Sequence, residues 1–186
     1  MESIKFAVNA KINLSLAVIG KRPDGYHNLD TVMQTVDISD SIFIKKSPTF
    51  LFESDKFGGE NNIAFKAAHC FFGAAGIEPS AEIRIKKIGG AAAAGVLVGL
   101  DRLFGTGFSK SRLREMAVSL GADVPFLIDG GTQRARGIGE ILTTLPHMPD
   151  CTFLIVLAGE KPSTGEMFKS LNNSDYIRPD IEKTVS

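Results

Sequence analysis

The chain has 186 residues, enough for one well-buried core or for one domain and part of a second. Lysine and arginine together number 21, as do aspartate and glutamate, so the formal net charge is zero and nothing steers the protein toward nucleic acid or anionic lipid. Hydrophobic residues make up 44% without a long apolar run, and no signal-peptide pattern is present, so we expect a cytoplasmic protein without a membrane span. Cys70 and Cys151 lack metal-ligand spacing, and we expect them to be reduced thiols.

The first third of the chain consists of short segments rich in β-formers. We expect strands at Ile4–Val8, Ile12–Val18, Thr31–Val36, Ser41–Lys45 and Phe50–Glu53. From the residue before the second of these onward, polar Lys11, Asn13 and Ser15 alternate with aliphatic residues. A strand there therefore places a lysine and an amide on one face.

A tight turn follows, in the run RPDGYH from Arg22 to His27. Its proline presets φ, and Gly25 tolerates positive φ. Tyr26 and His27 come just past the turn and offer a ring for stacking and an imidazole for hydrogen bonding. A lone cation on a strand, followed by a turn that presents aromatic groups, suits a small polar ligand.

The rest of the chain mixes helical and strand patterns. We expect a helix that starts near Asn62 as its N-cap, a strand at Ala81–Lys87 with Ala81, Ile83 and Ile85 inward, and helices at Ala91–Phe104 and from Ser109 to Gly121. Further strands are expected at Phe126–Ile128, Gln133–Arg136, Ile141–Leu145 and Thr152–Leu157, and a short helix at Ser163–Leu171. The polar tail beyond Asn172 has no clear partner.

Three glycine-containing segments are candidates for chemistry. In GADVPF, Pro125 disfavours helical backbone at Val124, so Asp123 should sit at a corner from helix to strand, where a carboxylate can point into a cleft. Gly89-Gly90 precedes an alanine-rich helix, whose N-terminal N–H groups suit phosphate. Glycine-rich turns also flank the strand at 133–136, but tight-turn geometry alone explains their glycines.

The motifs AKINL, RPDGYH, GADVPF and GGTQRARGIGE, in this order, resemble the 4-diphosphocytidyl-2-C-methyl-D-erythritol kinase family of the GHMP small-molecule kinases. The resemblance covers most of Lys5–Leu157 and continues weakly to Phe168. It implies an α+β GHMP kinase fold. Residues 1–149 would form an N-terminal domain like domain 2 of ribosomal protein S5, and residues 150–186 would begin a ferredoxin-like C-terminal domain that is incomplete here, with the active site in the cleft between them.

The resemblance implies ATP- and Mg²⁺-dependent phosphorylation of a hydroxyl of a cytidine-diphospho sugar alcohol, in non-mevalonate isoprenoid biosynthesis. The family's lysine and aspartate match Lys11 and Asp123. The aspartate would accept the proton of the attacking hydroxyl, and the lysine would stabilise charge. The partners implied are this substrate and ATP, in a monomer or homodimer, and no metal ligand is assigned.

The same resemblance assigns the binding residues. Tyr26 and His27 would stack on and hydrogen-bond the cytosine, Phe168 would be a second stacking ring, and Asn13 and Thr164 would make polar contacts. Asn62 matches a contact on the adenosine side, although an N-cap role explains it without a ligand. Gly89 and Gly90 are the candidates for contact with the ATP phosphates.

The sequence departs from the family in two places. The family has a glycine-rich phosphate loop, but here Lys86-Lys87-Ile88 runs directly into Gly89-Gly90, about ten residues shorter. The family's second domain also continues beyond Ser186. A sequence from which segments are missing, a truncated or degenerate product, and a complete protein whose phosphate site uses Lys86 and Lys87 all stay open; we favour the first, because both flanks of the break match. Rival functions are another GHMP kinase and a catalytically dead module that binds cytidine nucleotides.

Overall fold

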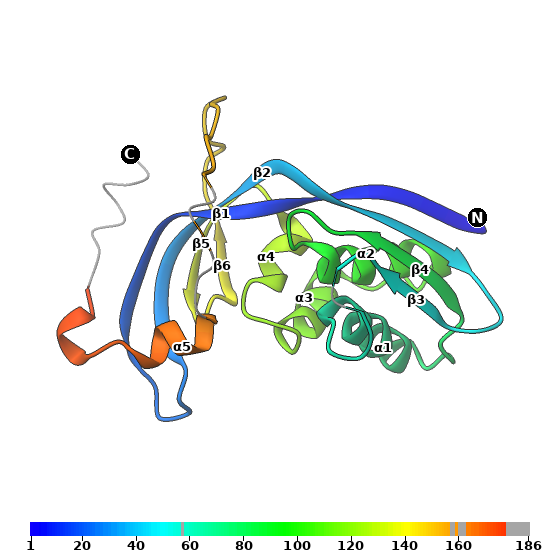
Figure 1. Ribbon diagram of the computed structural model, residues 1–186, viewed down its shortest axis with the longest axis horizontal. Helices are drawn as coiled ribbons and strands as arrows, with labels where there is room; N and C mark the ends of the chain where they lie inside the picture. Colours follow the sequence, from blue (N-terminus) through cyan, green and yellow to red (C-terminus); the bar gives the residue numbers. More distant parts are fainter. Residues whose placement is uncertain (57, 157–158, 160–162, 178–186) are drawn as a thin grey trace.

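The computed structural model describes residues 1–56, 58–156, 159 and 163–177. Its frame is a six-stranded sheet with strand order β3-β4-β2-β5-β6, to which β1 adds by pairing with β2. Helices α1 to α4 lie on one side of this curved sheet (Figure 1). The expected α+β architecture is therefore confirmed. Among the described helices, none has the length and apolar character to cross a membrane.

Strands β1 (Ser3–Lys21) and β2 (His27–Lys46) form one long antiparallel pair. Each was predicted as two shorter strands. The pairing shifts register between Asn9 and Lys11, between Asn13 and Ser15, and between Val18 and Gly20. Such bulges bend a strand without ending it, so the interruptions in the sequence pattern mark curvature.

The other strands pair around β2; they are β3 (Leu51–Ser54), β4 (Ala81–Lys86), β5 (Thr132–Gly137) and β6 (Ile141–Thr144). β4 pairs with the C-terminal part of β2, and β5 pairs with its N-terminal part. The two halves of the sheet thus share one strand. Because β2 is continuous, it links the helix-facing residues near its two ends through one backbone.

The helices are α1 (Ile63–Ala75), α2 (Ala92–Phe104), α3 (Lys110–Val118), α4 (Val124–Asp129) and α5 (Thr164–Lys169), with a 3₁₀ turn η1 (Asn173–Asp175). The predicted N-caps are confirmed, since Asn62 accepts from the N–H of Ala64 and Ser109 from that of Arg112. The main core lies between α1–α3 and the sheet, where the predicted inward residues of β4 meet the helices; its largest buried side chains include Phe71, Phe72, Ile42, Ile44, Ile83, Leu97 and Leu100.

The expected strand at Phe126–Ile128 is wrong, because these residues belong to α4. Pro125 lies in the first turn of this helix, where its missing N–H costs nothing. Phe126 is fully buried against Met33 and Ala135. A short apolar run has no period that separates a buried strand from a buried helix, so packing decided between them.

Two expectations for the C-terminal part are also wrong. Residues 152–156 are not in a strand, and Leu157 lies outside the described residues. β-formers need a partner edge, and Leu154 is instead 89% exposed. The tail, for which no partner was expected, reaches β1, where the N–H of Ile177 donates to the Val18 carbonyl at 3.0 Å.

Candidate active site

Lys11 and Asp123 meet where β1 faces the beginning of α4. The Nζ atom of Lys11 lies 3.1 Å from Oδ2 of Asp123 and donates a hydrogen bond of 2.9 Å to Oδ1 of Asn13. The Lys11 side chain is 13% exposed, whereas that of Asp123 is 57% exposed. The pair therefore combines a sheltered cation with a carboxylate that is open to a ligand.

Local structure directs each member toward the other. Lys11 follows Ala10, which the pairing of β1 with β2 skips at the first register shift. Asp123 is the N-cap residue of α4, but its side chain makes no capping hydrogen bond. Its carboxylate is thus available to Lys11, while Phe126 anchors the helix in the small cluster around Met33.

The face that carries Lys11 continues along β2. Lys11 pairs with Thr35 and Asn13 with Met33, and the hydroxyl of Thr31 lies 3.4 Å from Oδ1 of Asn13. Alternate residues of a strand share a face, so His27 and Thr31 lie on the same side of β2 as Thr35, the partner of Lys11. Ser15 was expected beside Lys11 and Asn13 but pairs with Val32 after the second bulge, which turns it to the opposite face.

The RPDGYH turn is closed by its own charges. Arg22 Nη2 lies 2.9 Å from Asp24 Oδ2, and the N–H of Tyr26 donates to Asp24 Oδ1 at 3.1 Å. The hydrogen bond from Arg22 lowers the pKa of Asp24, and the same contact raises the pKa of Arg22. Gly25 has φ +87°, as this turn requires. The turn leaves Tyr26 60% exposed and His27 buried.

His27 is the centre of an aromatic cluster. Its ring stacks on Phe168 with centroids 5.2 Å apart and planes at 21°, and the ring of Tyr176 lies 6.0 Å away, tilted by 59°. Its Nε2 atom is buried and has no hydrogen-bond partner in the described part of the chain. The structure thus places Phe168 against His27, and both residues were predicted to contact the cytosine. Thr164 is exposed at the first position of α5.

The residues predicted to contact ATP, which are Asn62, Gly89 and Gly90, have hydrogen-bond partners within the protein. Asn62 is 4% exposed and its side chain caps α1. The N–H groups of Ile88, Gly89 and Gly90 donate to one buried oxygen, Oδ1 of Asp40, at 2.6, 2.6 and 3.2 Å. An internal carboxylate thus accepts the N–H groups of Gly89 and Gly90, which precede the N-terminus of α2.

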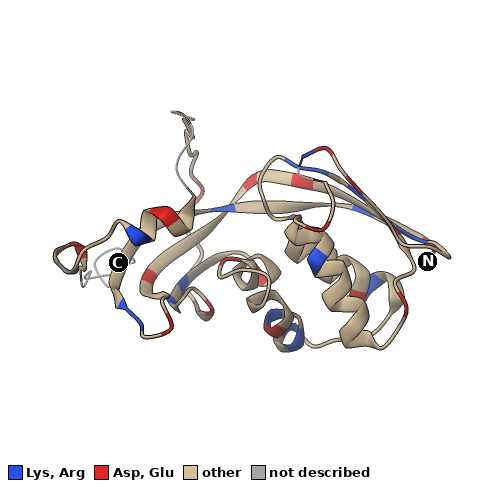
Figure 2. Cartoon of the chain, turned by 60° about the horizontal axis from the view of Figure 1, so that its bottom comes forward, with Lys and Arg blue, Asp and Glu red and all other residues tan. Residues whose placement is uncertain are grey.

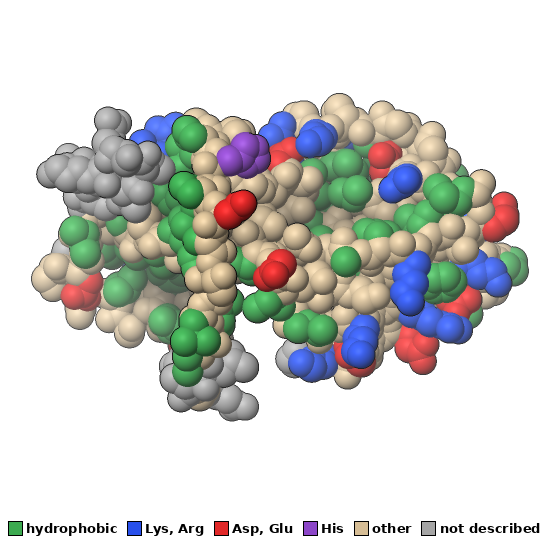
Figure 3. Space-filling model, turned by 90° about the horizontal axis from the view of Figure 1, so that it is seen from above, with side chains coloured by type: hydrophobic (Ala, Val, Ile, Leu, Met, Phe, Trp, Pro, Cys, Tyr) green, Lys and Arg blue, Asp and Glu red, His purple; other side chains and the backbone are tan. Residues whose placement is uncertain are grey.

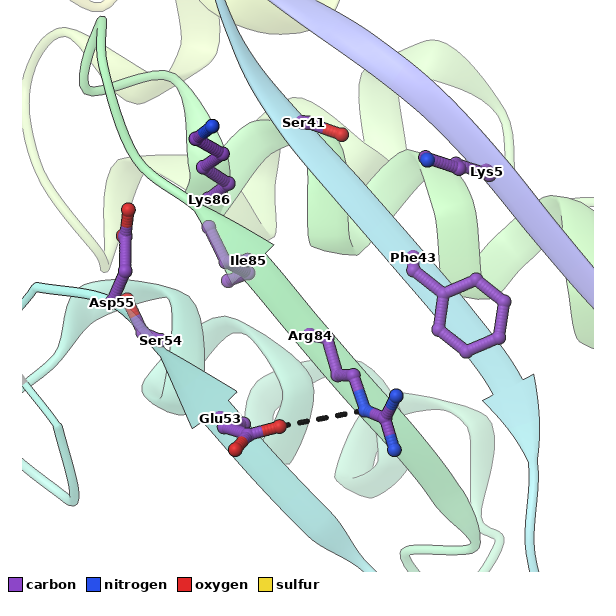
Figure 4. A pocket seen from close by; sticks show the side chains of 9 residues that line it. All are labelled: Lys5, Ser41, Phe43, Glu53, Ser54, Asp55, Arg84, Ile85 and Lys86. Atoms are coloured by element: carbon purple, nitrogen blue, oxygen red, sulfur yellow. Dashed lines mark ion pairs between the residues drawn. The ribbon is translucent and has the colours of Figure 1, made fainter.

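A separate depression lies on the sheet face turned away from the helices. Figure 4 shows its lining, with Lys5, Phe43 and Arg84 on neighbouring strands. Arg84 forms ion pairs with Glu53 and Glu82. Acidic and basic side chains are mixed along the whole chain and across this face (Figures 2 and 3). Lys86, the alternative phosphate-site residue, lines the depression, but none of the residues assigned by the family resemblance does, and its mixed charges single out no ligand.

Comparison with known proteins gives the family. The chain is 39% identical over 199 residues to 4-diphosphocytidyl-2-C-methyl-D-erythritol kinase of Acetivibrio thermocellus, which covers 100% of this chain and 70% of that protein. The chain belongs to the 4-diphosphocytidyl-2-C-methyl-D-erythritol kinase family. The enzyme of that name from Geobacter metallireducens is also 39% identical, over 92% of this chain and 66% of its own length. No family model matches the chain.

Solved structures agree with membership of this kinase family. A crystal structure of 4-(cytidine 5'-diphospho)-2C-methyl-D-erythritol kinase superposes with a TM-score of 0.80 at 28% identity, covering 98% of this chain and 70% of that one. The mevalonate kinase of Methanococcus jannaschii has a TM-score of 0.53 at 10% identity, which supports the GHMP kinase fold alone. The chain spans between 60% and 70% of the length of the first five curated kinases.

Three residues near the kinase family's motifs were not predicted from the sequence. Thr31 lies beside Asn13, Tyr176 beside His27, and Asp40 beneath the glycine turn. Thr31 and Asp40 stand in or near ordinary strand patterns, and Tyr176 lies in a polar tail. No local signal distinguishes them, because each acquires its neighbours only through tertiary contacts.

Proposed function

We propose that this chain transfers the γ-phosphoryl group of ATP to a hydroxyl of 4-diphosphocytidyl-2-C-methyl-D-erythritol, giving the 2-phosphate, in the non-mevalonate isoprenoid pathway. The names of its relatives motivate the substrate. The observation that carries the proposal is the 3.1 Å contact between Lys11 Nζ and Asp123 Oδ2. A cation beside an exposed carboxylate is the pair that phosphoryl transfer to an alcohol uses.

In the proposed reaction, the substrate oxygen forms a bond to the γ-phosphorus while the bond from that phosphorus to the bridging oxygen of ADP breaks. The hydroxyl proton passes to a carboxylate oxygen of Asp123. Lys11 stabilises the negative charge that develops on the transferred group. Asn13, bonded to Lys11, orients the acceptor and the ammonium group.

The acceptor would bind along the face that His27 shares with Lys11. Thr35, which pairs with Lys11, lies eight positions after His27 in β2, and this corresponds to about 26 Å along a straight strand. The curvature in Figure 1 shortens the direct separation. An elongated ligand, with a base joined through a diphosphate to a polyol, suits such a length. The cytosine would meet Tyr26, Phe168 and the Nε2 atom of His27, with Thr164 at the rim.

ATP would bind on the other side of Lys11, bordered by Asn62 and by the turn at Gly89 and Gly90. In kinase sites, Mg²⁺ is held by one or two carboxylates together with the substrate phosphates. The exposed carboxylate of Asp123 fits a site in which the protein supplies a single ligand. The described residues contain no cluster of three or more metal-ligating side chains. When bound, Mg²⁺ supplies charge neutralisation of the phosphates.

The division into domains is also a proposal. Residues 1–149 would carry Lys11 and Asp123, and residues 150–186 would begin the second domain. Two contacts support this arrangement, namely Phe168 on His27 and Ile177 on Val18, because both join the later segment to the strands that carry the site.

The test is ATP consumption by the purified protein with and without 4-diphosphocytidyl-2-C-methyl-D-erythritol, with mevalonate as the alternative acceptor. We expect turnover with the cytidine substrate and none with mevalonate. Turnover with mevalonate alone would indicate another GHMP kinase. Tight binding of the cytidine substrate without any turnover would indicate a non-catalytic binding module and would contradict the proposal.

A further inference from the structure

Gly89 approaches Ala10 more closely than any other residue type could. A Cβ atom built on Gly89 would lie 2.7 Å from Cβ of Ala10 and 3.2 Å from the carbonyl oxygen of Ile38. Carbon atoms in contact are normally about 3.5–4.0 Å apart. Gly89 is not among the glycines with positive φ, so close approach, and not backbone conformation, requires glycine here.

Ala10, like Leu14 and Ile19, has no register partner, and it comes directly before Lys11. A residue that the pairing skips at a bulge lacks the ladder hydrogen bonds that fix its neighbours, so other contacts must define its position. Ala10 is 6% exposed and Gly89 packs directly on it. The contact therefore acts on the backbone from which the Lys11 side chain projects.

Asp40 holds Gly89 in this place. One of its carboxylate oxygens accepts the N–H groups of Ile88, Gly89 and Gly90, and its side chain is fully buried. Hydrogen bonds to a charged acceptor are stronger than those between neutral groups. Three such bonds to a strand residue fasten the turn to the sheet beside the bulge.

We propose that Gly89 is a positioning residue for Lys11. Asp40 holds the turn at Gly89 against Ala10. The contact between Gly89 and Ala10 fixes the backbone before Lys11 and so keeps Lys11 Nζ beside Asp123. This inference rests on the proposed kinase function, and it assigns the glycine turn a role that does not depend on contact with phosphate.

The first variant is Gly89→Ala, whose new methyl group meets Ala10 and shifts the bulge. Displacing a reactive group by about 1 Å can cost about 100-fold in rate, so we expect kcat to fall by about 10- to 100-fold. KM values for ATP and for the cytidine substrate should change little if Gly89 acts through Ala10 and not through a phosphate contact.

The second variant, Ala10→Gly combined with Gly89→Ala, removes the methyl group that the new one strikes, and it should restore kcat. Gly73→Ala is the matched control, since a Cβ at Gly73 meets nothing within 4 Å, and it should leave kcat unchanged. A phosphate-contact role predicts the opposite pattern, a raised KM for ATP that Ala10→Gly does not correct.

Thermal unfolding of each variant shows whether that variant is folded. If Gly89→Ala is unfolded, the double variant decides alone, because a folded double variant with low kcat would overturn the inference. A crystal structure of each variant separates this inference from the proposed function, because it reports the contact between Lys11 and Asp123 even if the protein has no turnover. We expect Lys11 Nζ to move away from its position 3.1 Å from Asp123 Oδ2 in Gly89→Ala and to return in the double variant. A Lys11–Asp123 distance that is the same in all variants would overturn the positioning role.

Discussion

The ammonium group of Lys11 and the carboxylate of Asp123 are 3.1 Å apart, although one lies on β1 and the other precedes α4. Because the Asp123 side chain is 57% exposed, solvent screens the pair, and such pairs contribute about 0–1 kcal/mol to stability. Removing either member should therefore change chemistry far more than folding.

Replacing Lys11 by Ala should lower kcat by about 100- to 1,000-fold, the range seen when one stabilising donor is lost from a transition state. The unfolding temperature should fall by no more than about 2–4 °C, the shift expected for 1 kcal/mol in a chain of this size. Steady-state kinetics and calorimetry measure the two effects. Lys5→Ala, on the same strand but in the depression on the other face, is the control. Equal kinetics in both variants would remove Lys11 from the mechanism.

Replacing Asp123 by Asn keeps the shape of the side chain but abolishes proton acceptance. We expect kcat to fall by about 100- to 10,000-fold, with affinity for the cytidine substrate within a few-fold of the wild type. Single-turnover kinetics with calorimetric binding separate the two effects. Asp129→Asn, at the other end of α4 and paired with Arg114, should keep turnover. An active Asp123→Asn protein would exclude the proton-accepting role.

Replacing Phe168 by Ala removes the ring that stacks on His27. Stacking of a base on an aromatic ring contributes about 1–3 kcal/mol, so KM for the cytidine substrate should rise by about 5- to 150-fold with a smaller change in kcat. Tyr26→Ala should act in the same direction. Met167→Ala, exposed on the same helix, is the matched control. If KM stays constant in both aromatic variants, the base binds elsewhere.

The pair of Arg22 and Asp24 makes the RPDGYH turn sensitive to acid. The pKa of Asp24 is lowered in the folded protein, so its stabilising contribution is complete above the ordinary aspartate pKa and is lost as pH falls through the lowered value. NMR titration should give an Asp24 midpoint below that of an ordinary aspartate. Arg22→Gln should move this midpoint up toward the ordinary value, and an unchanged midpoint would show that the contact does not persist in solution.

Gly139 supports the chain directly before Asp123. Its φ is +126°, and a Cβ there would lie 3.1 Å from the carbonyl oxygen of Ala122. Gly139→Ala should destabilise the protein by about 1–3 kcal/mol and also lower kcat, because the strained turn pushes on Ala122. Gly131→Ala has a similar backbone penalty, with φ +79°, but meets nothing within 4 Å. Denaturant unfolding and kinetics should give both variants a stability loss, and only Gly139→Ala a loss of kcat beyond it.

Sequence patterns predicted those elements whose period and end signals agree. The alternation in β4, with Ala81, Ile83 and Ile85 inward, and the caps Asn62 and Ser109 are confirmed. α4 was missed because its six residues are too few to display a helical period. β1 was predicted as two strands because a bulge and a strand end interrupt the alternation of polar and apolar residues in the same way.

The sequence by itself determined the family, the chemistry-bearing residue types, and the turn that presents Tyr26 and His27, because motif identity and turn geometry are local. Only the tertiary structure decided that Lys11 reaches Asp123, that Phe168 stacks on His27 and that Asp40 takes the N–H groups of Gly89 and Gly90. These contacts join segments far apart in the chain, and they depend on bulges, on strand pairing and on the burial of α4. A local pattern cannot encode them, since each forms only in the folded chain.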